Sequence, residues 1–168
     1  MNRSRLFVCA IAVVAVCVTL SRVGVVAQSR TESTKPFIGM WRLVSIVDSK
    51  GQAPPNRGQH PTGFIVYDAS GHMSVQIMPD TPRPKYAGAQ ATPDEAKTAL
   101  TGYTAYFGTF TVDERARTVT HHLKGSINPG TIGVDNVRGY EFGPGDRVTL
   151  TVMPVTATST RLTWERVK

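Results

Sequence analysis

The sequence predicts an all-β protein, an antiparallel up-and-down eight-stranded barrel with one short helix between the third and fourth strands. Short runs rich in Val, Ile, Thr, Tyr and Phe recur along the chain, separated by Gly, Pro, Asp and Asn. Such runs are typical of strands and turns. Three of the connections are as short as hairpin turns, which favours a meander over a Greek-key sandwich with its long crossovers. A meander of eight strands can pair its two edge strands by closing into a barrel.

The eight strands are expected in direct succession along the chain. They occupy residues 41–48, 62–68, 72–78, 103–112, 117–124, 134–142, 147–153 and 160–167. The short turns lie between the second and third, the fourth and fifth, and the sixth and seventh of these runs, and each contains Gly or Asp. Both residues are favoured in turns, so each pair of runs is expected to form a hairpin.

The single helix is expected at residues 93–100, between the third and fourth strands. Thr92 precedes it as a favourable N-cap, and Pro93 suits the first helical position. Acidic residues follow in the first turn, and Gly102 lies just beyond the expected end. These are the start and stop signals of a short helix.

The first 27 residues have the pattern of a secretory signal peptide. Arg3 and Arg5 precede an uncharged apolar run at residues 6–20, and Val25 and Ala27 suit positions −3 and −1 of a cleavage site. The run is shorter than the roughly 20 residues of a membrane-spanning helix. We therefore expect cleavage, export to a periplasmic or extracellular location, and no stable membrane anchor afterwards. An uncleaved N-terminal anchor is the alternative.

Removal of this segment changes the composition of the 168-residue chain. The full chain has a formal charge of +7, and residues 1–27 contain three of its arginines and both of its cysteines. The remainder has a charge of +4, no cysteine for a disulfide, and no basic stripe or motif that would indicate a nucleic-acid partner. Residues 28–35 are polar and predict a flexible leader, and residues 36–168 predict one domain.

Alternation along the third strand predicts an apolar wall inside the barrel, because side chains two residues apart share a face. Met73, Val75 and Ile77 form this face, and Val148 and Leu150 are expected to extend it.

His121 is the first polar candidate for the interior. It shares a face with Val119 and Leu123, whereas His122 points to the opposite face. Adjacent residues of a strand diverge, so the two histidines do not predict a metal clamp and no metal site is expected. For His121, contact with a ligand and a satisfied position in the core both stay open.

Arg138 is the second polar candidate, on a face with Asn136, Tyr140 and Phe142. A buried arginine without a partner costs several kcal/mol, so it requires a carboxylate, a carbonyl or an anionic ligand. One interpretation is an anchor for a ligand carboxylate or enolate, with Asn136 and Tyr140 beside it. In one alternative, the Arg138 side chain extends to solvent from the open rim of the barrel. In the other, this strand has the opposite register.

Alternation leaves three strands undecided. The inward set of the first strand is either Trp41, Leu43 and Val47 or Met40, Val44 and Ile46. The inward set of the second is Phe64 and Val66 or Ile65 and Tyr67. The fourth strand is apolar on both faces, with Tyr103, Ala105 and Phe107 opposite Tyr106, Phe110 and Val112. The expected helix or a second subunit of a homo-oligomer would then cover its exterior.

Two connections, residues 49–61 and 79–92, are long for a compact domain and rich in Pro and Gly. Loops of this length are commonly functional or disordered. At a barrel mouth they would act as a lid, with Tyr86 and His60 as ligand contacts; mobile surface loops are the alternative.

Several stretches resemble the lipocalin-like domain family of bacteria and fungi, which is related to calycin-type barrels. They are residues 39–45 (GMWRLVS), 63–67 (GFIVY), 71–75 (GHMSV), 106–113 (YFGTFTVD) and 119–121 (VTH). Gly39 and Trp41 are similar to the Gly-x-Trp signature of these barrels, and Trp164 and Arg166 to their last strand, whose basic residue lies across the first-strand Trp. The resemblance covers residues 37–167 and implies the lipocalin-like barrel, with these four residues in structural roles. It does not imply a ligand.

The motifs of common enzyme classes do not occur in this sequence. It contains no Gly-x-Ser-x-Gly elbow, phosphate-binding Gly-rich loop or His-Glu-x-x-His, and we expect no cofactor. The leading hypothesis is an exported barrel that binds a small apolar or amphipathic ligand, which His121 and Arg138 orient. One alternative is a cofactor-free isomerase or cyclase in which His121 is the acid/base and Arg138 holds an oxyanion. The other is a packed barrel that acts as an inhibitor or interaction module.

Overall fold

The structure, a computed structural model, describes residues 32–168 of the chain. The chain divides into two compact units, and the second, Phe37–Lys168, contains the whole barrel. The predicted signal peptide, residues 1–27, lies outside the described residues, as does most of the predicted leader at 28–35. No helix of the described part is long and apolar enough to cross a membrane.

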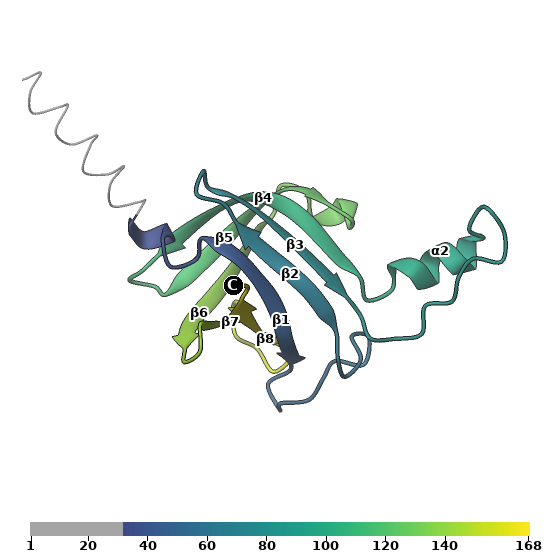
Figure 1. Ribbon diagram of the computed structural model, residues 1–168, viewed down its shortest axis with the longest axis horizontal. Helices are drawn as coiled ribbons and strands as arrows, with labels where there is room; N and C mark the ends of the chain where they lie inside the picture. The colour runs from purple at the N-terminus through teal and green to yellow at the C-terminus, as the bar shows by residue number, and fades with distance from the viewer. Residues whose placement is uncertain (1–31) are drawn as a thin grey trace, which may run out of the picture. The chain divides into compact units, whose positions relative to one another are not determined.

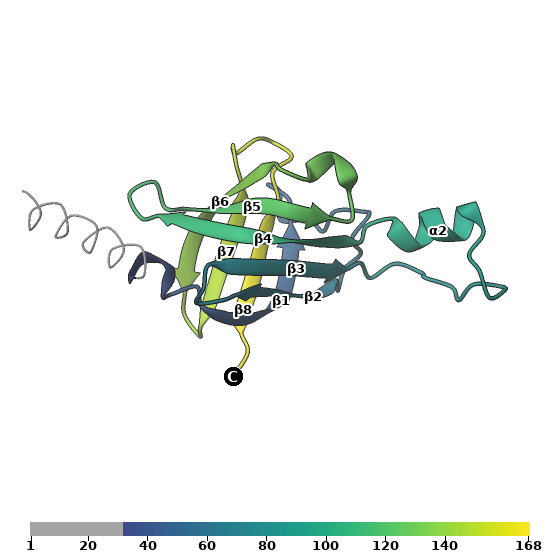
Figure 2. The same cartoon turned by 90° about the horizontal axis from the view of Figure 1, so that it is seen from above.

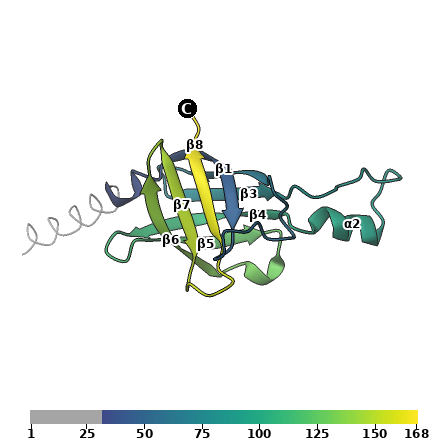
Figure 3. The same ribbon diagram turned by 90° about the horizontal axis from the view of Figure 1, so that it is seen from below.

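Eight antiparallel strands close into a barrel in sequence order (Figure 1). They are β1 (Gly39–Val47), β2 (Thr62–Tyr67), β3 (His72–Met78), β4 (Thr104–Asp113), β5 (Thr118–Ser126), β6 (Asp135–Gly143), β7 (Arg147–Val152) and β8 (Arg161–Arg166). The barrel closes where β8 pairs with β1, and Figure 3 shows β8 between β1 and β7. The predicted all-β eight-stranded barrel is confirmed, and each predicted strand end lies within two residues of the observed one.

The helix α2 (Pro93–Leu100) begins and ends at the predicted residues. Thr92 Oγ1 accepts a hydrogen bond from the Glu95 backbone N–H, and the Glu95 carboxylate accepts one from the Thr92 backbone N–H. This reciprocal capping box satisfies backbone donors that a helix N-terminus otherwise leaves without partners. A short 3₁₀ helix, η1 (Pro129–Thr131), lies between β5 and β6.

The expectation that the helix covers the outer face of the fourth strand is wrong. The connections on either side carry α2 past the end of the barrel at which β3 ends and β4 begins (Figure 2). None of its residues is buried. Phe107 on the outer face of β4 is 59% exposed, so cover by a second copy of the chain stays a prediction.

A β-bulge decides which residues of β1 point inward. Trp41 and Leu43 are buried, and the pairing of β1 with β8 shifts register between Leu43 and Ser45. The extra residue of a bulge reverses the alternation, so Ile46 is buried although an unbroken alternation would point it outward. The inward set therefore combines members of both expected sets. In β2 the inward residues are Ile65 and Tyr67, and in β4 they include Tyr106 and Phe110.

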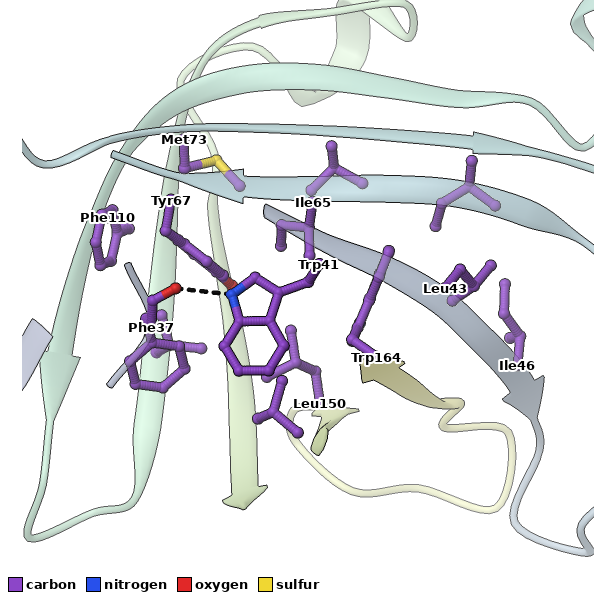
Figure 4. Packing of buried hydrophobic residues seen from close by; sticks show 14 residues of the cluster. Phe37, Trp41, Leu43, Ile46, Ile65, Tyr67, Met73, Phe110, Leu150 and Trp164 are labelled. Atoms are coloured by element: carbon purple, nitrogen blue, oxygen red, sulfur yellow. Dashed lines mark hydrogen bonds between the residues drawn. The ribbon is translucent and has the colours of Figure 1, made fainter. Parts of the chain in front are cut away.

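Trp41 contacts residues from both ends of the barrel unit. The indole N–H donates to the Phe37 carbonyl at 2.7 Å (Figure 4). The Arg166 guanidinium lies 4.1 Å from the centre of the indole ring. Arg166 also donates to the Ile38 carbonyl. Gly39 has a φ of +130°, and a Cβ on it would lie 2.9 Å from Arg166 Nη1. The Gly-x-Trp pattern therefore has a physical basis, because glycine leaves room for the arginine that covers the tryptophan.

Phe37, which precedes β1, fills the barrel beside Trp41. It is 1% exposed, and its ring packs against Tyr140 and Phe142 at centroid distances of 5.0 and 5.1 Å. These edge-on contacts, together with one to Tyr67, close this end with aromatic side chains.

Replacing Arg166 by Met is expected to lower the free energy of unfolding by about 1–3 kcal/mol. The variant loses the cation–π contact with Trp41 and the hydrogen bond to the Ile38 carbonyl. Urea denaturation measures the change. The control is Arg147→Met, which removes a half-exposed arginine 3.7 Å from Glu165 and should cost no more than about 0.5 kcal/mol. Equal losses in the two variants would contradict the role assigned to Arg166.

Candidate functional site

The barrel contains a cavity of about 450 Å³ that lies toward the end opposite Phe37. Apolar side chains from five strands form much of its wall: Ile65, Val75, Ile77, Leu123, Leu150 and Leu162. The loop between β1 and β2 contributes Pro54, Asn56 and Arg57 to the lining. The volume lies within the range of roughly 300–1,000 Å³ that is common for small-molecule sites.

Most of the predicted site residues meet in this cavity. His121, Asn136 and Arg138 all line it, together with Val75 and Ile77. Alternation therefore identified the inward faces of β3, β5 and β6 correctly. His121 and Arg138 come from neighbouring strands, in which His121 pairs with Asn136 and Arg138 with Val119.

The structure places other candidates outside the cavity. Tyr140 packs against Phe37 at the closed end, and Met73 pairs with Tyr67 at the same end, so these inward side chains belong to the core. Val148 is also a core residue. Tyr86 is 47% exposed and lies beside α2 in a separate groove, because the connection that carries it leads away from the barrel. Of the two expected lid loops, residues 49–61 contribute to the lining and residues 79–92 do not.

His121 is buried between two tyrosines, with 1% of its surface exposed. Its Nε2 lies 2.8 Å from Tyr67 Oη, and its Nδ1 lies 3.0 Å from Tyr106 Oη. Burial lowers the pKa of His121 to about 3, and the positive charge of Arg138 contributes in the same direction. The imidazole is therefore neutral, with one ring nitrogen that donates and one that accepts.

The surroundings of Tyr67 determine which ring nitrogen of His121 carries the proton. Tyr67 is 1% exposed, does not line the cavity, and has His121 as its polar side-chain partner among the described residues. A buried O–H without an acceptor is costly, so we assign the Tyr67 hydroxyl as the donor to His121 Nε2. The Nδ1–H of His121 then donates to Tyr106 Oη, and this leaves the Tyr106 O–H free to donate into the cavity.

Tyr106 was not among the candidates that the sequence identified. Its neighbours on β4 are mostly apolar, like those of a core residue, and only its hydrogen bond with His121 on the adjacent strand β5 indicates a polar role. Burial raises the pKa of Tyr106 although Arg138 opposes this shift, so the phenol keeps its proton at neutral pH. The sequence signal that could have found it is an inward tyrosine on the strand paired with the strand of an inward histidine.

His122 lies on the outer surface, as the alternation predicted. Its Nδ1 lies 2.7 Å from Asp135 Oδ1 and its Nε2 lies 2.9 Å from Thr111 Oγ1, so it connects β4, β5 and β6. Within residues 32–168, no three His, Cys, Asp or Glu side chains are grouped as a metal site would require.

A closed eight-stranded meander with an internal cavity and a Trp–Arg pair at its closed end is the architecture expected of a lipocalin-like barrel. The chain belongs to the lipocalin-like domain family, whose sequence pattern matches residues 38–167. The family suggested by the sequence motifs is thereby confirmed.

The solved structures that match include two crystal structures of variants of the fluorescent protein UnaG. Each is 13% identical to this chain and covers 80% of it. The alignments include 99% and 98% of those chains, with TM-scores of 0.39 and 0.38. No curated protein matches the sequence.

The buried neutral His121 predicts a pH-dependent stability. The unfolded chain binds a proton at this residue below about pH 6.5, whereas the folded chain resists it down to a pKa of about 3. The stabilisation is therefore complete above about pH 6.5 and is lost as the pH falls toward 3. The free energy of unfolding should fall by up to about 1.4 kcal/mol per pH unit in this window because of His121.

Urea denaturation across this pH window measures the effect. His121→Gln should remove this part of the pH dependence while lowering stability at neutral pH. His60→Gln, at an exposed position, is the control and should retain the pH dependence. An unchanged pH dependence in His121→Gln would show that the buried imidazole is not its source.

Proposed function

We propose that this protein is an exported member of the lipocalin-like family that binds a small, largely apolar ligand inside its barrel. The observation that carries the proposal is one cavity of about 450 Å³ inside the barrel, lined by apolar side chains from five strands together with polar ones. His121 and Arg138 both line it. This combination is typical of small-molecule sites, where apolar surface supplies affinity and a few polar groups supply orientation.

Ligand binding is favoured over a cofactor-free isomerase or cyclase that uses His121 as its acid/base. A general acid or base must reach the proton that it transfers, directly or through one water. Both ring nitrogens of His121 are engaged by Tyr67 and Tyr106, and its pKa of about 3 lies far below neutral pH. His121 is better suited to orienting Tyr106 than to exchanging protons with a ligand.

Blocking the cavity tests ligand binding. Ile77 lines the cavity from β3, whereas its neighbour Gln76 is exposed on the outer face of the same strand. Ile77→Trp is expected to fill part of the cavity and to abolish binding, and Gln76→Trp adds the same side chain outside without this effect. Native mass spectrometry of protein from its own host measures co-purifying ligand, and titration with an apolar fluorescent probe measures affinity.

We expect a bound small molecule in the wild type and in Gln76→Trp, and none in Ile77→Trp. Circular dichroism and thermal melting confirm that each variant is folded. Ligand-free wild-type protein, together with probe binding that Ile77→Trp leaves unchanged, would overturn the proposed function.

Export is tested by the N-terminus of the protein made in its own host. Cleavage after Ala27 predicts a mature chain that begins at Gln28, which N-terminal sequencing and intact mass detect. Ala27→Arg should block cleavage, because the position before the cut requires a small residue. A chain that retains residues 1–27 in the wild type would support the uncleaved anchor instead.

A further inference from the structure

We infer that the ligand is an amphipathic anion whose carboxylate-type head group binds at Arg138 and Tyr106. This inference rests on the proposed function and specifies the class of molecule that the cavity takes. Three features support it: the charges around the cavity, the direction of its hydrogen bonds, and the connection of Tyr106 to the buried His121.

The charged residues that line the cavity are all basic. Arg57 and Arg138 contribute to the wall, and no Asp or Glu does. A cation or a zwitterion with an exposed ammonium would meet these arginines without a compensating carboxylate. An anion would be attracted by both, and the attraction is stronger in a cavity of low dielectric constant than in water.

Neither arginine has an acidic partner within the described part of the chain. Arg138 Nη1 donates to the Val137 carbonyl at 2.9 Å, and Arg57 donates to the Gly102 carbonyl and to Thr104 Oγ1. All of these acceptors are neutral. Burial lowers the pKa of Arg57, which reflects the cost of desolvating its charge. A ligand that brings a negative charge would offset this cost, whereas a neutral ligand would not.

The groups beside Arg138 are also arranged as donors. The guanidinium has only donors. Tyr106 Oη accepts the Nδ1–H of His121 in the assigned tautomer, so its own O–H is directed to a further acceptor. The Asn136 side chain lines the same wall and offers an amide N–H₂. Arg138 and Tyr106 therefore favour a ligand with acceptor oxygens, and a carboxylate supplies two that can accept from both residues together.

His121 and Tyr67 act as positioning residues in this arrangement. The hydrogen bonds from Tyr67 to His121 and from His121 to Tyr106 keep the Tyr106 hydroxyl directed into the cavity while all three side chains stay neutral. Val75, Ile77 and Leu150 contribute apolar lining that suits the body of an amphipathic molecule.

Three probes with the same ten-carbon chain test the head group: decanoate, decan-1-ol and decylamine. Isothermal titration calorimetry at neutral pH, on protein freed of bound molecules, measures the affinity of each. We expect decanoate to bind at least about tenfold more tightly than decan-1-ol, because a hydrogen bond to a charged group contributes more than a neutral one. Decylamine is expected to bind most weakly.

Matched variants assign the preference to its residues. Arg138→Met should reduce the affinity for decanoate to that for decan-1-ol. Tyr106→Phe should reduce the affinity for decanoate several-fold and the affinity for decan-1-ol by a smaller factor, because a neutral hydrogen bond contributes less. Arg161→Met, at an exposed position on β8, is the control and should preserve the preference. Arg138→Lys retains the charge without the planar donor pair, so it should retain part of the preference if Arg138→Met fails to fold.

The outcomes separate this inference from the proposed function. Equal affinities of the wild type for decanoate and decan-1-ol, or a preference that survives in both Arg138→Met and Tyr106→Phe, would overturn the anionic head group but not ligand binding. Failure of all three probes, together with ligand-free protein from the native host, would overturn the proposed function itself.

Discussion

The fold depends on the contact between Trp41 near its beginning and Arg166 near its end. The guanidinium covers the indole ring, the indole N–H binds the Phe37 carbonyl, and Gly39 leaves the space in which Arg166 lies. These contacts act where β1 pairs with β8, the pairing that removes both free edges of the meander. They also hold Phe37 inside the barrel, where aromatic contacts close one end. The cavity lies toward the other end because aromatic side chains fill this one.

The buried His121 imposes a second constraint: it fixes which groups donate and which accept in the hydrogen bonds between Tyr67, His121 and Tyr106. His121 is neutral because burial and Arg138 both disfavour its charged form. With Tyr67 enclosed by the core, a single direction of hydrogen bonding satisfies all three groups and presents the Tyr106 hydroxyl to the cavity. The same arrangement makes stability depend on pH and gives one cavity wall its donor character. Structural and ligand-binding roles of His121, which the sequence left open, are therefore compatible: it is a satisfied core residue that orients a group at the site.

Features that depend on neighbours in sequence were predictable. The helix N-cap at Thr92, the hairpins, and the inward direction of Val75 and His121 follow from local chemistry and from the two-residue period of a strand. The inward set of β1 was not predictable in this way, because the bulge at Leu43 and Ser45 depends on the partner strand β8. Tyr106 was missed for a related reason. Its polar role exists only through His121 on the next strand.

The sequence by itself determined the succession of strands, the closed meander, the helix and most of the residues that point inward, because these follow from alternation and turn chemistry. Only the tertiary structure decided which inward residues line the cavity and which pack around Phe37 at the closed end of the barrel. Tyr140 and Arg138 share a face of β6, yet Tyr140 packs on Phe37 while Arg138 lines the cavity. The position of a residue along the barrel axis depends on the stagger of all eight strands and on where Phe37 inserts. Neither can be obtained from the pattern of one strand.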